Sequence, residues 1–225
     1  EGVIIQIYKQ MNQVEITENE IHAQAGALLS MIANRAMEAE LTGFEFAAGI
    51  PGTLGGACVM NAGAYGGEMK DVLETVTVLT RDGDVKTLTK DELELGYRTS
   101  VIAKKDYIVL SAVIRLENGK KEEIKAVMDD LKEKRITKQP LEYPSAGSTF
   151  KRPEGYFAGK LIQDAGLRGF QVGGAQVSEK HCGFVVNKDQ ATAADVMNLM
   201  NQVSDKVYEM SGVRLEPEVK RLGVF

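Results

Sequence analysis

The sequence has no run of about 18 consecutive apolar residues, so no membrane span is predicted. It also lacks an excess of basic residues: 27 lysines and arginines stand against 32 aspartates and glutamates, for a net charge of -5. Nucleic-acid binders gain affinity largely by neutralising phosphates, so this balance argues against that class. A local basic pocket for a small anionic ligand is still compatible with an acidic protein.

The sequence contains only two cysteines and two histidines. Cys58 and Cys182 lie far apart, with no CxxC motif or Cys/His cluster around either. This arrangement favours free, buried thiols in a reducing compartment, although a structural disulfide stays open. The scarcity of histidine and the lack of a GxSxG motif give little support to Ser-His-Asp hydrolysis.

The beginning of the chain has no signal-peptide pattern. It starts with Glu1 instead of Met and continues at once into the strand-like stretch GVIIQIYK. The simplest account is that the chain has lost an N-terminal portion.

The 225 residues are 44% hydrophobic and 26% charged, as expected for a globular chain with one large domain or two ordinary ones. Strand and helix patterns interleave without regular βαβ alternation, which favours the α+β class. Pro140 and Pro144 bracket a linker, so we expect a domain boundary near residue 138.

Strand signals recur along the chain. Apolar and β-branched runs predict strands at residues 3–7, 106–116, 181–187 and 214–223. The dipeptide Asp82-Gly83 lies between two such runs and predicts a hairpin over residues 74–89. The stretch TKDE, residues 89–92, has capping-box spacing and predicts a short helix after it.

Helical periodicity predicts a helix within residues 25–43 with Gly43 as its stop, one after residue 119, one at 157–166, and one that begins near Thr192. Thr192 and Asp195 have capping-box spacing, and Gly212 stands where a C′ glycine belongs. The apolar faces consist of Leu28, Leu29, Ile32 and Ala36; of Ile124, Val127, Met128 and Leu131; and of Val196, Leu199, Met200, Val203, Val207 and Met210.

The densest chemical signal is GIPGTLGGACVMNAGAYGGE, residues 49–68, with seven glycines. Glycine permits positive φ and close approach to a ligand, and successive backbone N–H groups can form an anion-binding nest. The stretch lacks the Gly-Lys-Ser/Thr ending of a Walker loop and does not match GxGxxG behind a strand. A tight, glycine-bent linker between strands explains the composition equally well.

Three further stretches are weak signals when each is taken alone. In GYRTS, residues 96–100, an arginine beside a tyrosine is usually a surface or packing residue. Ser148 lies in SAGSTFKRP among glycine, aromatic and basic residues, but a serine in a turn most often bonds to the backbone. Glu218 in LEPEV is by default a charge on an edge strand.

Taken together and in order, these stretches resemble the UDP-N-acetylenolpyruvoylglucosamine reductases, FAD enzymes of bacterial peptidoglycan precursor synthesis. The motifs span essentially the whole chain: GIPGTLGGACVMNAGAYGGE, GYRTS, SAGSTFKRP, AGKLIQDAGLRG, GGAQVSEKHCGFVVN and LEPEVKRLG. The resemblance implies an α+β protein with a partial FAD-binding domain of the vanillyl-alcohol-oxidase/PCMH type over residues 1–138. A smaller α+β substrate-binding domain would follow over 139–217, and 218–225 would be a strand that returns to the FAD-binding part.

The same resemblance implies a cytoplasmic enzyme in which NADPH reduces FAD. The flavin N5 then passes a hydride to the enol ether of UDP-N-acetylglucosamine enolpyruvate, and UDP-N-acetylmuramate results. Arg98, Ser148 and Glu218 match the family's catalytic positions. Ser148 would donate the proton that completes the reduction. Arg98 would pair with the substrate carboxylate, and a protonated Glu218 would hydrogen-bond the same group.

The glycine-rich stretch would line the flavin with its backbone N–H groups. The cofactor-binding residues implied are Gly49, Ile50, Pro51, Gly52, Thr53, Gly55, Gly56, Asn61, Gly63 and Ala64. Lys138 and His181 match polar substrate contacts of the family, and Arg152 and Lys160 are added on charge alone. These four are the candidates for binding the diphosphate and uridine; no metal, nucleic-acid or membrane partner is expected.

Two features depart from the family pattern. The family's N-terminal segment, with its own glycine-bearing FAD-phosphate loop, is missing. Only VIAKKD, residues 101–106, separates GYRTS from the next strand, as in the shorter form of the family that lacks an inserted loop. Two alternatives stay open: an FAD-dependent oxidase of the same superfamily, and a UDP-sugar-binding fragment without catalysis.

Overall fold

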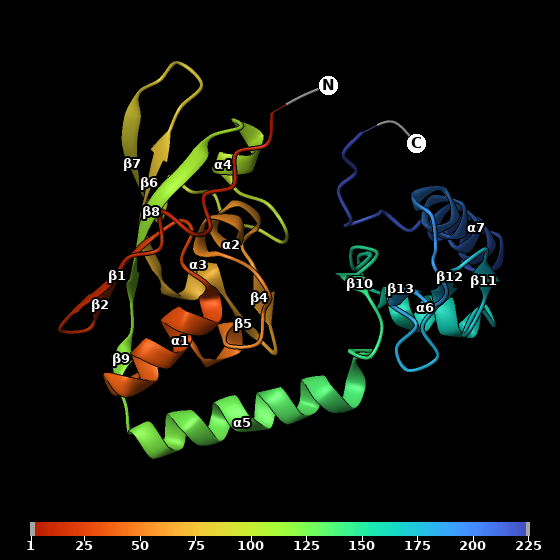
Figure 1. Cartoon of the computed structure of the whole chain (residues 1–225), viewed down its shortest axis with the longest axis horizontal. Coiled ribbons are helices and arrows are strands. Elements are labelled where there is room, and N and C mark those ends of the chain that lie inside the picture. The colour runs from red at the N-terminus through yellow and green to blue at the C-terminus, as the bar shows by residue number, and fades with distance from the viewer. Residues whose placement is uncertain (1–2, 224–225) are drawn as a thin grey trace. The chain divides into compact units, whose positions relative to one another are not determined.

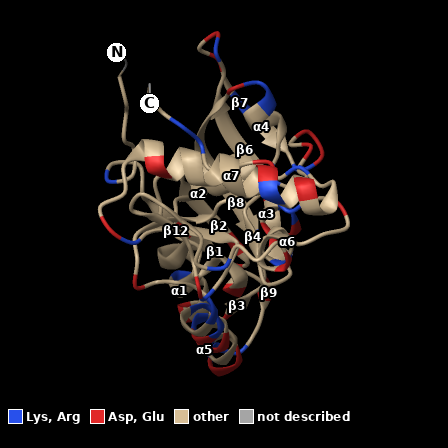
Figure 2. Ribbon diagram, turned by 90° about the vertical axis from the view of Figure 1, so that its right-hand side faces the viewer, with Lys and Arg blue, Asp and Glu red and all other residues tan. Residues whose placement is uncertain are grey.

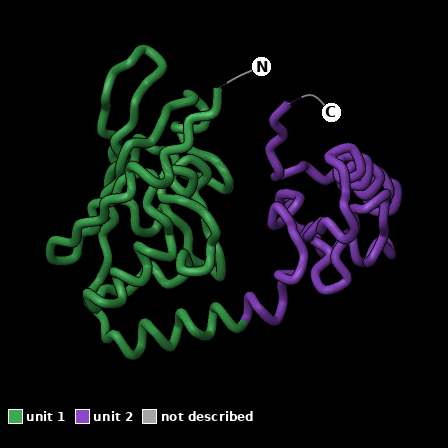
Figure 3. The backbone as a smooth tube through the Cα atoms, viewed as in Figure 1, with its two compact units in different colours: residues 1–133 green, residues 134–225 purple. Residues whose placement is uncertain are grey.

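A computed structural model describes residues 3–223 of the chain (Figure 1). The chain divides into two compact units, of which the first ends at Glu133 and the second begins at Lys134 (Figure 3). The division falls inside helix α5 (Lys121–Lys138), whose last residue is the expected boundary position. Helices and strands of both units confirm the α+β class.

Unit 1 is built around a five-stranded antiparallel sheet with the strand order β1-β2-β8-β6-β7. The strands are β1 (Val14–Thr17), β2 (Glu20–Gln24), β6 (Leu73–Leu79), β7 (Val85–Thr89) and β8 (Ile108–Arg115). The hairpin predicted around Asp82-Gly83 is confirmed as β6 and β7, and Gly83 has the positive φ, 91°, that such a turn requires. The strand predicted at 106–116 is confirmed as β8.

Short elements surround this sheet in unit 1. They are α1 (Leu29–Glu38), β3 (Leu41–Thr42), the 3-10 helix η1 (Glu45–Ala47), α2 (Leu54–Met60), β4 (Gly63–Ala64), β5 (Gly67–Glu68), α3 (Met69–Val72), α4 (Val101–Lys104) and β9 (Glu117–Asn118). Helix α2 packs across β2 and β8, so the glycine-rich stretch lies against the centre of the sheet. The predicted first helix is confirmed as α1, but it ends at Glu38, before Gly43.

Unit 2 contains a four-stranded sheet with the order β10-β13-β12-β11 and two helices. Its elements are β10 (Ser145–Ser148), α6 (Ala158–Asp164), β11 (Gln171–Val172), β12 (Ala175–Val177), β13 (Phe184–Asn187) and α7 (Ala193–Ser211). The predicted capping box at the start of α7 is confirmed: Asp195 N donates to Thr192 Oγ1 at 3.1 Å, and Thr192 N donates to Asp195 Oδ2 at 2.8 Å. Gly212 ends the helix with a φ of 70°.

Three predicted elements are absent from the described residues. Residues 3–7 have no regular secondary structure, and Val3, Ile4 and Ile5 are each more than four-fifths exposed. Residues 214–223 are irregular apart from one bridge between Pro217 and Phe150. Both predictions of a strand were wrong because a strand requires a hydrogen-bonded neighbour, which an apolar pattern alone does not supply. After TKDE the chain forms a turn instead of a helix.

Helix α5 carries lysines and acidic residues along its length, as the blue and red segments of Figure 2 show. Glu122 and Glu123 lie in its first turn, and Arg135 and Lys138 lie in its last turn, which suits the helix dipole. Ile124 is its only buried residue, so most of the helix is in contact with solvent. No helix within residues 3–223 is long and apolar enough to cross a membrane.

Candidate active site

Three glycines of the glycine-rich stretch are required by internal packing. A methyl group on Gly55 would lie 3.0 Å from Ala25 Cβ, where α2 meets the end of β2. On Gly63 it would lie 2.8 Å from the Gly67 carbonyl oxygen, and on Gly67 it would lie 2.7 Å from the Phe46 ring. Within residues 49–68, all described, Gly66 is the only glycine with a positive φ. Close approach therefore explains these glycines better than backbone freedom does.

Two other glycines of the stretch face open space. A methyl group at Gly52 or Gly56 would meet no atom of the described residues within 4 Å, and both positions are exposed. Two backbone hydrogen bonds hold this loop to the start of α1: Leu29 N donates to Gly52 O at 3.1 Å, and Leu54 N donates to Ala27 O at 2.9 Å. A fixed backbone without side chains in front of it suits the close approach of a flat ring, so these residues fit a flavin.

The other implied cofactor residues lie around this backbone. Gly49 and Pro51 are exposed, Ile50 and Thr53 are half-buried, and Gly63 and Ala64 form β4. Asn61 is buried, and it ends α2 in the left-handed conformation with a φ of 45°.

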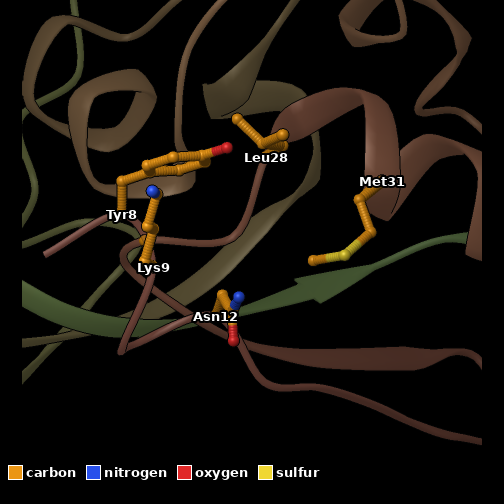
Figure 4. Close-up of a pocket in the computed structure, with 6 residues that line it drawn as sticks. Tyr8, Lys9, Asn12, Leu28 and Met31 are labelled. Carbon is orange, nitrogen blue, oxygen red and sulfur yellow. The ribbon is translucent and has the colours of Figure 1, made fainter.

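A small cavity of about 160 Å³ lies at the start of α1 (Figure 4). Its lining consists of Tyr8, Lys9, Asn12, Gly26, Leu28 and Met31. Leu28 forms a β-bridge with Thr53, which connects the cavity wall to the loop before α2. No motif in the sequence indicates a pocket here, because its lining comes from the irregular segment before β1, from the loop after β2 and from the first turn of α1.

Arg98 lies in a tight turn with an unusual backbone. Gly96 and Thr99 exchange backbone hydrogen bonds of 3.1 and 3.2 Å across it. Arg98 has a φ of 54°, which is uncommon for a residue with a side chain and is held only where the surroundings enforce it. The guanidinium group is centred 5.1 Å from the Tyr97 ring, and Arg98 is half-buried.

Ser148 and Glu218 come together in unit 2 although 70 residues separate them in sequence. Ser148 ends β10 and is exposed. The next residue, Thr149, is buried; its N–H donates to Gly183 O at 2.9 Å, and its Oγ1 accepts from Val185 N at 2.9 Å. Glu218 N donates to Thr149 O at 2.9 Å, so a half-buried glutamate lies beside a firmly held serine.

His181 has a defined tautomer. Its Nδ1 accepts a hydrogen bond of 3.0 Å from Gly183 N, so the ring presents its other nitrogen, Nε2, as a donor. Burial lowers the pKa of His181, and the charge of Arg168 lowers it further, which favours the neutral ring. The ring also packs edge-on against Phe184.

The remaining basic candidates are more exposed. Lys160 forms an ion pair with Asp164, and both residues belong to α6. The residue before Lys160, Gly159, lies against the His181 ring, because a methyl group on it would be 3.5 Å from the ring. The guanidinium group of Arg152 lies 4.0 Å from the centre of the Phe157 ring. Lys138 is the exposed last residue of α5; two residues before it, the Ile136 carbonyl accepts a hydrogen bond from Lys180 Nζ at 2.8 Å. The structure thus brings His181 near α6 and its chain neighbour Lys180 to the end of α5.

Comparison with known sequences gives two family matches. The family described as "UDP-N-acetylenolpyruvoylglucosamine reductase, C-terminal domain" matches residues 139–222, and the family described as "FAD binding domain" matches residues 1–89.

Three individual proteins are similar over nearly the whole chain. The UDP-N-acetylenolpyruvoylglucosamine reductase of Agathobacter rectalis is 60% identical over 236 residues, which cover 100% of this chain and 75% of the relative. The reductase of Clostridioides difficile is 55% identical, with 99% and 73% covered. A crystal structure of the reductase from Thermus caldophilus has 39% identity and a TM-score of 0.77, and the match covers 88% of this chain and 71% of that one.

Proposed function

Since the chain belongs to the UDP-N-acetylenolpyruvoylglucosamine reductase family, we propose that it reduces UDP-N-acetylglucosamine enolpyruvate to UDP-N-acetylmuramate in cytoplasmic peptidoglycan precursor synthesis. The family is flavin-dependent, and NADPH is the proposed reductant. The observation that carries the proposal is the hydrogen bond from Glu218 N to Thr149 O, which brings a carboxyl-bearing residue next to an exposed serine.

FAD, when bound, supplies the two-electron chemistry: it accepts a hydride from NADPH and gives a hydride to the terminal carbon of the enol ether. We assign the open backbone at Gly52 and Gly56 to the flavin, because a side chain there would occupy the space of the ring. The remaining residues of the stretch hold this backbone in place. The end of α2 is capped by Asn61, and β4 follows with Gly63 and Ala64, so these residues determine where the chain leaves the helix.

Ser148 is the proposed proton donor. Hydride addition leaves negative charge on the carbon next to the carboxylate, and the Ser148 hydroxyl gives that carbon its proton, so an O–H bond breaks and a C–H bond forms. A serine is a weak acid, but a basic carbanion accepts its proton if the distance is fixed. The bonds of Thr149 fix the backbone at this point, and solvent can restore the proton because Ser148 is exposed.

Arg98 and Glu218 act on the substrate carboxylate in this proposal. A guanidinium group binds a carboxylate through two parallel hydrogen bonds and stabilises charge that spreads onto it. Glu218 is the second residue that we assign to this carboxylate. A Glu218→Gln chain that turns over as fast as the parent would count against this role.

The basic candidates bind the nucleotide end of the substrate. Positive charge for the diphosphate comes from Arg152, Lys160 and Lys138. The attraction between these charges and the diphosphate grows where binding removes water between them. His181 offers an uncharged Nε2–H donor, which suits a uracil carbonyl or a phosphate oxygen.

The proposal is tested first by visible absorption of the purified chain after addition of FAD and desalting. We expect retained flavin that NADPH bleaches and that UDP-N-acetylglucosamine enolpyruvate restores without oxygen. Retained flavin that only oxygen restores would favour the oxidase alternative. A chain that binds UDP-sugars and retains no flavin would favour the fragment without catalysis.

The proton donor is tested by Ser148→Ala with Ser145→Ala as the matched control. Ser145 lies on the same strand and accepts a hydrogen bond from Gly147 N at 3.0 Å, so its loss disturbs the turn and leaves the Ser148 hydroxyl. In Ser148→Ala we expect unchanged bleaching by NADPH and recovery by the enolpyruvyl sugar slowed by about 10²- to 10⁴-fold. Equal effects in the two variants would contradict the role of Ser148.

A further inference from the structure

The side chain of Asn61 is fully used inside unit 1. Its Nδ2 donates to Glu68 Oε2 at 2.6 Å and to the Gly96 carbonyl at 3.1 Å, and its Oδ1 accepts from Lys70 N at 2.8 Å. The amide has two N–H bonds, and both are engaged. Asn61 is 1% exposed, so it has neither a donor left nor a surface to offer to a ligand.

One of these bonds ends on the turn that carries Arg98. The Gly96 carbonyl accepts from Thr99 N, which closes the turn, and from Asn61 Nδ2, which anchors the turn to the end of α2. A carbonyl oxygen has two lone pairs, and here each has a donor. Asn61 therefore binds the same carbonyl oxygen, that of Gly96, whose bond with Thr99 N closes the turn.

The other side of the turn has a second anchor on the same helix end. Ser100 follows Thr99, is 0% exposed, and donates from Oγ to the Val59 carbonyl at 2.6 Å. Ser100 Oγ also accepts from Ala103 N at 3.2 Å, which caps α4. Arg98 thus lies between two attachments to the last turn of α2, one at residue 96 and one at residue 100.

We propose that Asn61 and Ser100 are positioning residues that hold Arg98 in its left-handed turn, and that Asn61 acts through Gly96 instead of through contact with the flavin. This inference rests on the proposed role of Arg98 toward the substrate carboxylate. A bidentate pair requires a fixed guanidinium group, and a misplacement of about 1 Å lowers rates by up to about 10²-fold. Asparagine suits the position because it tolerates the left-handed conformation and carries both donors and an acceptor.

The anchors are tested by trypsin cleavage after Arg98 in the 225-residue chain, with cleavage after Lys188 of unit 2 as the internal reference. Asn61→Gly removes the side chain and keeps the positive φ without strain. Asn61→Asp keeps the size but turns both donor bonds into repulsion with Glu68 and the Gly96 carbonyl. Loss of one such bond, worth about 1 kcal/mol, raises the open population and the cleavage rate after Arg98 about fivefold.

The controls separate anchoring from general loosening. Asn118→Asp makes the same chemical change at an exposed asparagine of β9 and leaves cleavage after Arg98 unchanged. Ser100→Ala raises cleavage as Asn61→Gly does, and Ser100→Thr, which keeps the hydroxyl, restores protection. If an Asn61 variant fails to fold by circular dichroism, the Ser100 pair decides. Unchanged cleavage in Asn61→Asp and Ser100→Ala would overturn the inference.

A binding measurement distinguishes this inference from the proposed function. Calorimetry compares the affinities for UDP-N-acetylglucosamine enolpyruvate and for UDP-N-acetylglucosamine, which lacks the carboxylate. We expect the anchor variants and Arg98→Ala to lose the preference for the first ligand, with the second bound as before. If the anchor variants are cleaved faster but they and Arg98→Ala all keep the preference, the anchors support the turn and the role of Arg98 toward the carboxylate is refuted. If only Arg98→Ala loses the preference, the role of Arg98 stands and the positioning by Asn61 and Ser100 is refuted.

Discussion

The difference between glycines that pack and glycines that face a ligand gives the sharpest prediction. Gly56 is the third residue of α2, and a methyl group there meets no described atom within 4 Å. Gly67 lies under Phe46, and a methyl group there would lie 2.7 Å from two ring atoms and 3.0 Å from Phe46 Cβ. Gly56→Ala and Gly67→Ala therefore make the same chemical change in opposite surroundings.

The two variants should change stability in opposite directions. Alanine is a better helix former than glycine, so Gly56→Ala should stabilise unit 1 by about 0.5–1 kcal/mol. In Gly67→Ala the ring atoms closest to the new methyl group are those nearest the Phe46 backbone, so the side chain cannot rotate away. Overpacking of this kind costs about 1–3 kcal/mol.

In Gly56→Ala the affinity for FAD should fall although the stability rises. If the flavin ring lies on the backbone at Gly56, a methyl group there costs about 1–3 kcal/mol of binding free energy, which raises the dissociation constant for FAD about 5- to 160-fold. Urea denaturation gives the stability change, and quenching of flavin fluorescence gives the affinity. A Gly56→Ala chain that is more stable and binds FAD as tightly as the parent would refute the assignment of this backbone to the flavin.

Three further predictions concern unit 2 and the thiols. Thr192→Ala removes the bond from Asp195 N and should lower the free energy of unfolding by about 1 kcal/mol in urea denaturation. Burial lowers the pKa of His181 below its ordinary value near 6.5, so near this pH the unfolded chain binds more protons than the folded chain. The free energy of unfolding should therefore fall as the pH drops from about 6.5 toward the pKa of the folded chain. His181→Phe should remove this dependence of stability on pH. Burial raises the pKa of Cys58 to about 12 and also raises that of Cys182, and both thiols are free and buried. A chromogenic disulfide should therefore react with neither thiol at pH 8 in the native chain and with both in denaturant.

Local signals in the sequence predicted the elements that local chemistry determines. The turn at Gly83 and the capping box at Thr192 are confirmed because each depends on a few neighbouring residues. TKDE shows the limit of this rule: Thr89 N does donate to Glu92 Oε2 at 2.8 Å, but no helix follows. A single turn is a costly nucleus, and the chain reverses at Glu94 with a φ of 45° before it can propagate.

Long-range contacts account for what the sequence could not predict. The bonds of Asn61 reach Gly96, 35 residues away, and the bond of Ser100 reaches Val59, 41 residues away. Neither spacing has a periodic signal. The motifs predict roles for Arg98 and Ser148, but only the folded chain shows which buried side chains hydrogen-bond next to them.

The exposed character of α5 has a consequence for how the chain opens without unfolding. Of its 18 residues only Ile124 is buried and Met128 packs half-buried against the core of unit 1, so packing stabilises little of the helix beyond Met128. Most of the stability of a helix in a protein comes from packing, and the Lys125–Asp129 pair adds only a few tenths of a kcal/mol. Backbone amides in the second half of α5 should therefore exchange with deuterium through local fraying, at rates that denaturant barely changes. The sheet of unit 1 should exchange only on global opening, so the second half of α5 should open independently of the sheet in the same chain.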